Sequence, residues 1–180
     1  MPESSRRELA ERVGRLEDER AIVATLYAYG TALDYGDRLL FLDCFTEDAE
    51  WRIAGMVLRG RVEIASTLER LMENFHRVLM TFRTPILEVG NGVASGRTYV
   101  TEQSAFKNGR PGTTIGLYYE RFVRQDDRWR FTWRLFQLHY MGPADLTGSF
   151  FEQADYGAPP AMPPLDAPTY NYSGLGAGKS

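Results

Sequence analysis

The order of helix-like and strand-like patterns along this chain limits its fold more than any other feature of the sequence. Up to about residue 75 apolar residues recur mainly at helical spacing, whereas β-rich runs follow. These runs cover residues 77–89, 93–107, 113–125 and 128–141. Gly-Asn-Gly, Asn-Gly-Arg-Pro-Gly and Gln-Asp-Asp-Arg separate them, and such residues are typical of antiparallel hairpins. Helices followed by strands predict an α+β fold, in which a strongly curved, mostly antiparallel sheet wraps around N-terminal helices as a cone.

Local signals set the expected ends of the helices. Ser5 and Glu8 have the spacing of a capping box, which predicts the start of a long helix, and Gly36 predicts its end. A break near Asp18 is the alternative to one continuous helix. Asp37 is suited to cap a second, short helix. The expected helices cover about residues 5–35, 39–45 and 62–75, and a strand is expected over 49–59.

Composition divides the chain into two parts. Residues 1–141 carry the helical and strand patterns and are expected to form one α+β domain with an N-terminal helical extension. Residues 142–180 contain a Pro-rich stretch and a Gly-rich end, which are unsuited to a central strand. One or two helical turns are expected over 146–154. We predict that this tail folds over the pocket of its own chain or of a neighbour.

Charge and cysteine content disfavour several classes of function. The net charge is −3 and the 21 basic residues are scattered among 24 acidic ones, so a nucleic-acid partner is not expected. The single Cys44 rules out an internal disulfide and a thiolate metal site, and no paired histidine motif predicts another metal site. No glycine-rich phosphate loop follows a strand, and we expect no cofactor. Without a leader sequence or an apolar spanning run, a cytoplasmic protein with no membrane partner is the default expectation.

Two polar residues on an otherwise apolar helix are the first candidates for a functional site. Tyr29 lies on the apolar stripe, and Asp34 lies about 140° away, beside Gly30. A mid-helix glycine costs about 1 kcal/mol relative to alanine, and the missing side chain of Gly30 would leave room for a ligand. Asp34 is therefore a candidate base, or the orienter of one, and Tyr29 a candidate donor to a carbonyl or hydroxyl oxygen. In the alternative interpretation, Asp34 is solvated at the helix end and Tyr29 belongs to the core.

Short motifs continue from this helix into the first strand. Tyr29 and Asp34 are followed by Gly36-Asp37 and then by the segment Phe45–Ala49. This order resembles the opening of the nuclear transport factor 2-like superfamily, in its SnoaL-like and scytalone-dehydratase-like branch. The resemblance covers about residues 18–141 and depends on the order and spacing of the motifs together. It implies the cone fold with a pocket inside.

The resemblance also implies roles for individual residues. Scytalone dehydratase, bile acid 7α-dehydratase and hexachlorocyclohexane dehydrochlorinase pair the helix Asp with a strand His, whose imidazole removes a proton. Asp34 matches that Asp, but Met80 stands where the His is expected. His76, expected at the end of the preceding helix, and His139, expected near the cone mouth, are the remaining candidates for the proton carrier. Arg134 matches the Arg that the dehydrochlorinase uses on its last strand, and would stabilise a leaving group or an anion.

Ketosteroid isomerase shares the fold and uses a Tyr at the position of Tyr29. Its Asp base falls on Ile53 in this chain, which argues against the same mechanism. Its second oxyanion-hole acid falls near Tyr118, whose phenol can still donate a hydrogen bond. The residues expected to bind the substrate are Tyr118, Trp51, Met80, Phe82, Tyr99 and Phe136.

Charged strand residues have a simpler interpretation. Alternation places Glu102 on the face of its strand opposite to Tyr99. Arg130 and Arg134 can pair across strands with Glu102 or Glu120. For Glu120 and Arg130 we expect an exterior charge ladder, whereas the resemblance places Arg134 in the pocket.

These observations predict a cofactor-independent lyase or isomerase, of dehydratase or cyclase type, that acts by acid–base chemistry on a small, ring-containing hydrophobic substrate. The alternative is a non-catalytic ligand-binding or subunit-assembly module of the same fold. We also expect a homodimer or higher homo-oligomer formed through the convex face of the sheet. Phe122, Phe131 and Trp133 are the residues expected to be exposed there.

Overall fold

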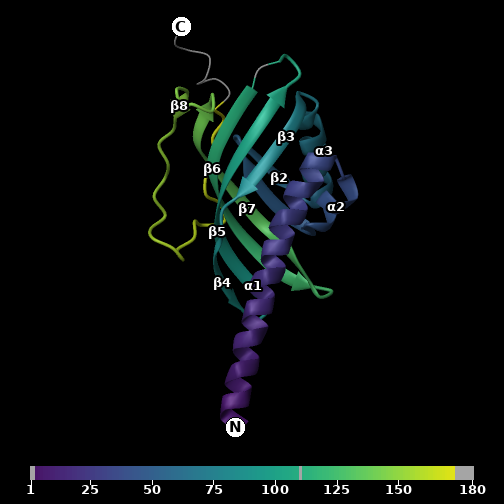
Figure 1. The fold of residues 1–180 in the computed structure, drawn as a ribbon, viewed down its shortest axis with the longest axis vertical. Helices are drawn as coiled ribbons and strands as arrows, with labels where there is room; N and C mark the ends of the chain where they lie inside the picture. Colours follow the sequence, from purple (N-terminus) through teal and green to yellow (C-terminus); the bar gives the residue numbers. More distant parts are fainter. Residues whose placement is uncertain (1–2, 110, 173–180) are drawn as a thin grey trace.

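The computed structural model describes residues 3–109 and 111–172, and it has the predicted α+β architecture (Figure 1). The helices are α1 (Glu3–Tyr35), α2 (Arg38–Asp43) and α3 (Arg61–Met72). The strands are β1 (Phe45–Ile53), β2 (Met56–Arg59), β3 (Phe75–Phe82), β4 (Ile86–Gly90), β5 (Val93–Phe106), β6 (Pro111–Gln125), β7 (Arg128–Gly142) and β8 (Ser149–Phe150).

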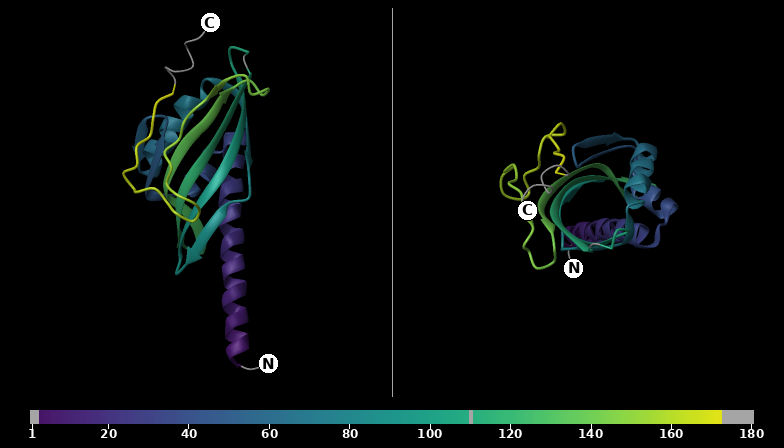
Figure 2. Two further views of the ribbon diagram at one scale, coloured as in Figure 1. Left: turned by 90° about the vertical axis from the view of Figure 1, so that its left-hand side faces the viewer. Right: turned by 90° about the horizontal axis from the view of Figure 1, so that it is seen from above.

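The strands form one curved sheet that does not close. Its main path runs β2-β1-β7-β6-β5-β3, with β4 paired to β5 and β8 to β7. Only the pair of β1 with β7 is parallel among the described pairs. The twist of the long strands β5, β6 and β7 curls the sheet, and α1 lies across its open side (Figure 2). The predicted cone is confirmed.

Only the C-terminal half of α1 packs against the sheet. The buried residues of α1 are Ile22, Leu26, Tyr29, Ala32 and Leu33. Residues 3–17 project beyond the sheet (Figure 1), and the helix runs through Asp18 without a break. Gly36 adopts a φ of 68° where α1 ends. The carboxylate of Asp37 caps α2 by accepting from the Leu40 amide at 3.0 Å. Both boundary signals therefore act as predicted.

Other boundaries differ because extended backbone is interrupted locally. The strand expected over 49–59 is a hairpin, whose turn has positive φ at Ala54 and Gly55. The run 77–89 is two strands, because Pro85 has no amide hydrogen to continue a ladder. The helical turns expected over 146–154 are wrong: this segment contributes the short strand β8 and is otherwise irregular.

A β-bulge in β7 decides which side chains face the interior. In β6, Phe122 pairs with Phe131 of β7, and the preceding residue pairs with Trp133, so Thr132 has no partner. The bulge reverses the alternation of side chains along β7. Consequently Phe131 and Arg134 both face the interior, whereas Trp133 faces outward.

The C-terminal tail lies along the outer face of the sheet, on the side away from α1 (Figures 1 and 2). Its apolar residues Tyr156, Met162 and Ala167 pack against a cluster on the sheet. The sheet residues of that cluster are Leu117, Tyr119, Trp133 and Leu135. Side chains of the sheet also donate to tail carbonyls: Arg97 to Ala161 (2.9 Å), Arg121 to Pro163 (3.1 Å), Trp133 to Leu165 (3.0 Å) and Arg52 to Ala167 (2.9 Å). The tail thus covers the convex face and not the pocket that the sequence predicted.

This arrangement corrects the expected oligomer surface. Phe122 and Phe131 are buried in the interior core, and Trp133 is buried beneath the tail. None of the three is exposed on the convex face. Their apolar character reflects two separate cores on the two sides of one sheet.

Candidate functional site

Arg134 is a fully buried cation at the centre of the cone interior. Its side chain is 0% exposed, as is that of Glu120, its ion-pair partner on β6. The guanidinium donates from Nε and Nη2 to Oε1 of Glu120, at 3.0 and 2.8 Å. Thr98 donates its hydroxyl proton to the other carboxylate oxygen at 2.7 Å. Both oxygens of Glu120 are therefore occupied, and the geometry of Arg134 is held from one side.

Aromatic rings surround the guanidinium on its remaining sides. The carbon Cζ of Arg134 lies 3.9 Å from the ring centroid of Tyr118, 4.3 Å from that of Tyr29 and 5.8 Å from that of Trp51. Phe131 adds a fourth ring at 4.2 Å. Such contacts favour the cation by cation–π attraction, and they exclude water from it.

Two buried N–H donors beside these rings have no acceptor. Nη1 of Arg134 and Nε1 of Trp51 lack a hydrogen-bond partner among the described residues. Trp51 and Arg134 are register partners on the parallel strands β1 and β7, so their side chains leave the sheet on the same face. Leaving a buried donor unpaired costs about 1–3 kcal/mol, so the arrangement favours a bound acceptor atom.

Burial also controls the protonation of the surrounding groups. It raises the pKa of Tyr29, against the opposing effect of Arg134, and raises the pKa of Tyr118 further. Both phenols are therefore protonated near neutral pH, and the hydroxyl oxygen of Tyr29 accepts from Tyr118 and from the guanidinium of Arg134. Burial opposes the charge on Arg134, but Glu120 and the two phenols favour it, and its pKa is raised above the ordinary value. The interior therefore offers several donors at neutral pH.

Comparison of the amino-acid sequence with known protein families identifies the family of this chain. A family described as the SnoaL-like domain matches residues 14–134, which is most of the chain. The chain belongs to the SnoaL-like domain family. No protein with a curated description matches it.

Solved structures with the same nuclear transport factor 2-like fold resemble this SnoaL-like protein over most of its length. A candidate scytalone dehydratase from Novosphingobium aromaticivorans is 20% identical, with a TM-score of 0.68, and the match covers 85% of this chain and 96% of that one. A type 2 hexachlorocyclohexane dehydrochlorinase is 21% identical, with a TM-score of 0.68 and coverage of 84% and 99%. A candidate aromatic ring hydroxylase from Novosphingobium aromaticivorans is 27% identical, with a TM-score of 0.64 and coverage of 68% and 90%.

Among the described residues, Asp34 of this SnoaL-like protein pairs with Arg77 and not with Arg134. Its side chain is 26% exposed, and its Oδ1 lies 3.6 Å from Nε of Arg77, at the start of β3. Gly30, one turn earlier, receives the ring of Phe82: a Cβ there would lie 2.9 Å from the Phe82 ring. The space beside Gly30 is thus filled by this chain itself.

Neither histidine joins the buried arginine. His76 lies in β3 rather than at the end of a helix, and its side chain is exposed. His139 packs edge-on against Tyr99, with ring centroids 5.7 Å apart, and Tyr99 is stacked with Arg83 on the outer face of the sheet. The expected approach of His139 to Asp34 and the expected place of Tyr99 in the pocket are therefore wrong. Burial lowers the pKa of His139 at this outer position.

The other predicted residues are distributed between the site and its surroundings. Tyr29, Trp51, Tyr118 and Arg134 come together, and the ring of Phe136 packs against that of Tyr118 at a tilt of 44°, with centroids 4.9 Å apart. Met80 and Phe82 pack against the same core.

Two carboxylates were missing from the predicted site. The exterior ladder expected for Glu120 is wrong, because Glu120 pairs with Arg134 inside the cone. Glu102 on β5 is partly buried, accepts from the Ser104 hydroxyl at 2.7 Å, and has a pKa raised by burial. Alternation on β5, which separates Glu102 from Tyr99, was the signal that could have placed Glu102 inside.

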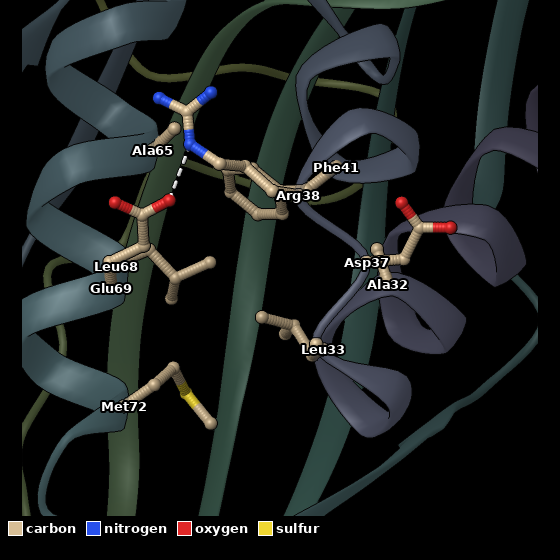
Figure 3. Close-up of a pocket in the computed structure, with 10 residues that line it drawn as sticks. Ala32, Leu33, Asp37, Arg38, Phe41, Ala65, Leu68, Glu69 and Met72 are labelled. Carbon is tan, nitrogen blue, oxygen red and sulfur yellow. Dashed lines mark hydrogen bonds and ion pairs between the residues drawn. The ribbon is translucent and has the colours of Figure 1, made fainter.

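A cavity of about 150 Å³ opens beside this site, between α1, α2 and α3 (Figure 3). Its walls are mainly apolar, and an ion pair of Arg38 with Glu69 spans it. The apolar wall consists of Ala32, Leu33, Phe41, Ala65, Leu68 and Met72. The ring of Phe41 also lies 5.5 Å from that of Tyr29, so Phe41 touches both the cavity and the site.

Two classes of feature are absent from residues 3–109 and 111–172. No helix there is long and apolar enough to cross a membrane. No group of three or more His, Cys, Asp or Glu side chains there is placed to hold a metal ion.

Proposed function

We propose that this SnoaL-like protein is a cofactor-independent lyase or isomerase for a small, ring-containing hydrophobic substrate. The observation that carries the proposal is the buried Arg134, whose Nη1 points to no acceptor beside the equally unpaired Nε1 of Trp51. An oxygen or halide of the substrate would complete both donors. The aromatic surroundings suit a flat, apolar ring.

Stabilisation of developing negative charge is the chemistry that these groups can supply. Glu120 and Thr98 hold Arg134 in place before any substrate binds, so no reorganisation is needed during the reaction. The phenol of Tyr29 lies against the guanidinium and is kept protonated by burial. An enolate oxygen or a departing anion at this position would accept from all of these donors.

The similar solved structures are consistent with such a substrate. Two of them are described as a candidate scytalone dehydratase and as a dehydrochlorinase, both of which are lyases. A third is described as a candidate aromatic ring hydroxylase. The names of the dehydrochlorinase and of the hydroxylase refer to ring compounds, and the apolar cavity is lined by Phe41, whose ring adjoins that of Tyr29.

A ligand-binding module without catalysis is the second candidate. The observation that favours it is Met80, which occupies the position of the expected histidine, while both histidines lie outside the site. A protein that only binds would need the donors of Arg134 and Trp51 but no proton carrier.

Replacing Tyr118 by phenylalanine tests the proposed site. We expect Tyr118→Phe to lower turnover of hydroxylated cyclic ketones about 100-fold, because Tyr29 loses the hydrogen bond that orients its hydroxyl toward the developing charge. Loss of water from each ketone is followed by mass spectrometry, and binding by ligand-observed NMR. Tyr119→Phe is the matched control: Tyr119 is the next residue but packs against Tyr156 outside the sheet, so its variant should behave as wild type. Binding without turnover in wild type would favour the binding module, and equal effects of the two variants would remove Tyr118 from the site.

A further inference from the structure

The geometry points to Glu102 as the group that carries the proton in this site, a role that rests on the proposed function. Glu102 faces Met80 directly across the β3–β5 ladder, so it lies beside the residue that replaces the expected histidine. On its other side, the register partner in β6 is Thr114. A carboxylate is thus the neighbour of Met80 on the inner face of the sheet, where the relatives are expected to have an imidazole.

The surroundings of Glu102 suit an acid–base group. Two phenols face it, Tyr29 from α1 and Tyr118 from β6, and its negative charge contributes to raising the pKa of both. Its register partners Met80 and Thr114 carry no charge. Burial raises the pKa of Glu102 itself, and the Ser104 hydroxyl opposes that shift. A carboxyl with a raised pKa is a stronger base once it is ionised.

The partial exposure of Glu102 distinguishes it from the other interior carboxylate. Glu120 is 0% exposed and both of its oxygens are occupied, so it has no oxygen with which to accept a substrate proton. Glu102 has one recorded partner, Ser104, and retains some contact with solvent. It can therefore exchange a proton with both substrate and water.

The proposed step balances without a co-reactant. The Glu102 carboxylate takes a proton from a carbon next to a ring carbonyl, and the C–H electron pair forms the C=C bond of an enolate. The negative charge moves to the carbonyl oxygen, which Arg134 and Trp51 bind. The protonated Glu102 then returns the proton to another carbon, which gives an isomer, or to a departing β-hydroxyl, which leaves as water. The substrate class is thus a cyclic compound with an enolisable carbonyl.

Exchange of the acidic carbon-bound hydrogens of 2-tetralone in D2O, followed by NMR, tests this step without the natural substrate. Wild type should accelerate the exchange, and Glu102→Gln should reduce the acceleration at least about 100-fold while still binding 2-tetralone. Glu88→Gln, an exposed glutamate on β4, is the matched control and should behave as wild type. The rate should rise with pH through the pKa of Glu102, because the ionised form is the base. Ser104→Ala should move that midpoint to higher pH, since the Ser104 hydroxyl lowers the pKa of Glu102.

The possible failures are distinguishable. The role of Glu102 would be overturned if Glu102→Gln exchanged the hydrogens of 2-tetralone as fast as wild type while Asp34→Asn did not. The proposed function would then still stand. Wild type that binds 2-tetralone without exchanging it would overturn both. An unchanged midpoint in Ser104→Ala would remove Glu102 as the titrating base.

A second inference concerns the projecting part of α1 and is independent of the site. We infer that residues 3–27 of α1 pair with the same helix of a second copy in antiparallel orientation. Leu9, Val13 and Leu16 are 49%, 44% and 63% exposed. They are spaced by four and three residues, and the same spacing continues through Arg20, Val23 and Tyr27. This heptad spacing is typical of a seam between two helices.

The projecting part of α1 is too short to be stable as an isolated helix, and a partner would stabilise it. Residues 3–17 project beyond the sheet (Figure 1), and an isolated helix of that size is marginal in water. Gly14, in its middle, lowers helix stability further by about 1 kcal/mol. The tail packs on part of the convex face of the sheet, whereas no described element packs on the exposed side chains of Leu9, Val13 and Leu16 on α1.

Charge favours the antiparallel direction. In a parallel pair each residue meets its own copy, which would place two Arg20 side chains together in the seam. In an antiparallel pair Arg20 lies opposite Leu9 of the other copy. Arg12 of each helix, which flanks the seam, then lies beside Glu19 of the other copy. The two opposite charges therefore meet twice, once on each side of the midpoint of the helix pair.

Sedimentation equilibrium and spin-label distances test this pairing on the full chain. Wild type should be a dimer, and Leu9→Glu/Leu16→Glu should be monomeric with an unchanged melting temperature of the sheet domain. Leu39→Glu, at an equally apolar position on α2 that is 77% exposed, is the control and should remain dimeric. Labels on Ser4→Cys should lie about 30 Å apart, because some 21 residues at 1.5 Å each separate them in an antiparallel pair. A monomeric wild type, a dimer that survives the double substitution, or closely spaced labels would each overturn the inference.

Discussion

Arg134→Met is expected to destabilise the folded protein by about 3–5 kcal/mol, because it leaves the carboxylate of Glu120 buried without its counter-ion. Both side chains are 0% exposed, so water cannot replace the lost partner. The cost is measured as the shift in the midpoint of urea unfolding. Arg128→Met is the matched control on the same strand. The side chain of Arg128 is 66% exposed in its pair with Asp43, and removing such a surface pair costs at most about 1 kcal/mol.

A second substitution separates the buried charge from other effects. Arg134→Met combined with Glu120→Gln should recover part of the lost stability, because no unpaired carboxylate then remains. Ligand binding should not recover, since Nη1 of Arg134 is absent from both variants. Equal instability of the single and double variants would show that packing of the guanidinium between aromatic rings, and not its charge, carries the effect.

Undocking the C-terminal tail should have the second largest effect. Ala167 is 1% exposed and belongs to the cluster between the tail and the sheet, and Ala167→Asp would place an unpaired carboxylate there. We expect a loss of about 3 kcal/mol and self-association, because the apolar cluster around Trp133 and Leu135 becomes exposed. Urea unfolding and sedimentation velocity measure the two effects. Asp166→Ala changes the neighbouring, exposed residue and should leave both unchanged.

A tail that contributes little would contradict this expectation. Stability within about 0.5 kcal/mol of wild type in Ala167→Asp would mean that the outer cluster is not held by the tail. The site offers an internal comparison, because the tail lies on the opposite face of the sheet. Binding of cyclic ketones by the folded fraction should therefore be retained.

Local chemistry was sufficient to predict much of the fold from the sequence. Gly36 and Asp37 mark the boundary between α1 and α2 because a positive φ and a side-chain cap are properties of single residues. The hairpin turns mark the long strands for the same reason. Failures occurred where the backbone conformation depends on distant partners, as in segment 146–154, which pairs with the end of β7.

The candidate site was likewise predicted correctly where local signals suffice and wrongly where distant contacts decide. Tyr29 lies on the stripe of α1 that faces the core, and helical periodicity alone places it there. Glu120 and Tyr99 were assigned to the wrong faces, because alternation along a strand separates two faces without showing which one is covered. The tail makes the outer face of the sheet apolar as well. An apolar side chain on a strand therefore does not indicate which of the two faces it lies on.

The sequence by itself determined the α+β class, the SnoaL-like family and the helix that presents Tyr29, since these depend on periodicity, turn residues and motif spacing. The resemblance already implied a pocket position for Arg134, but only the tertiary structure showed how β7 turns this side chain inward. Strict alternation from Phe131 would have turned Arg134 outward, and the unpaired Thr132 reverses that alternation. A bulge depends on how two strands align, and that alignment reflects the packing of the whole cone. The pairing of Arg134 with Glu120, and with it the candidate site, therefore exists only in the folded chain.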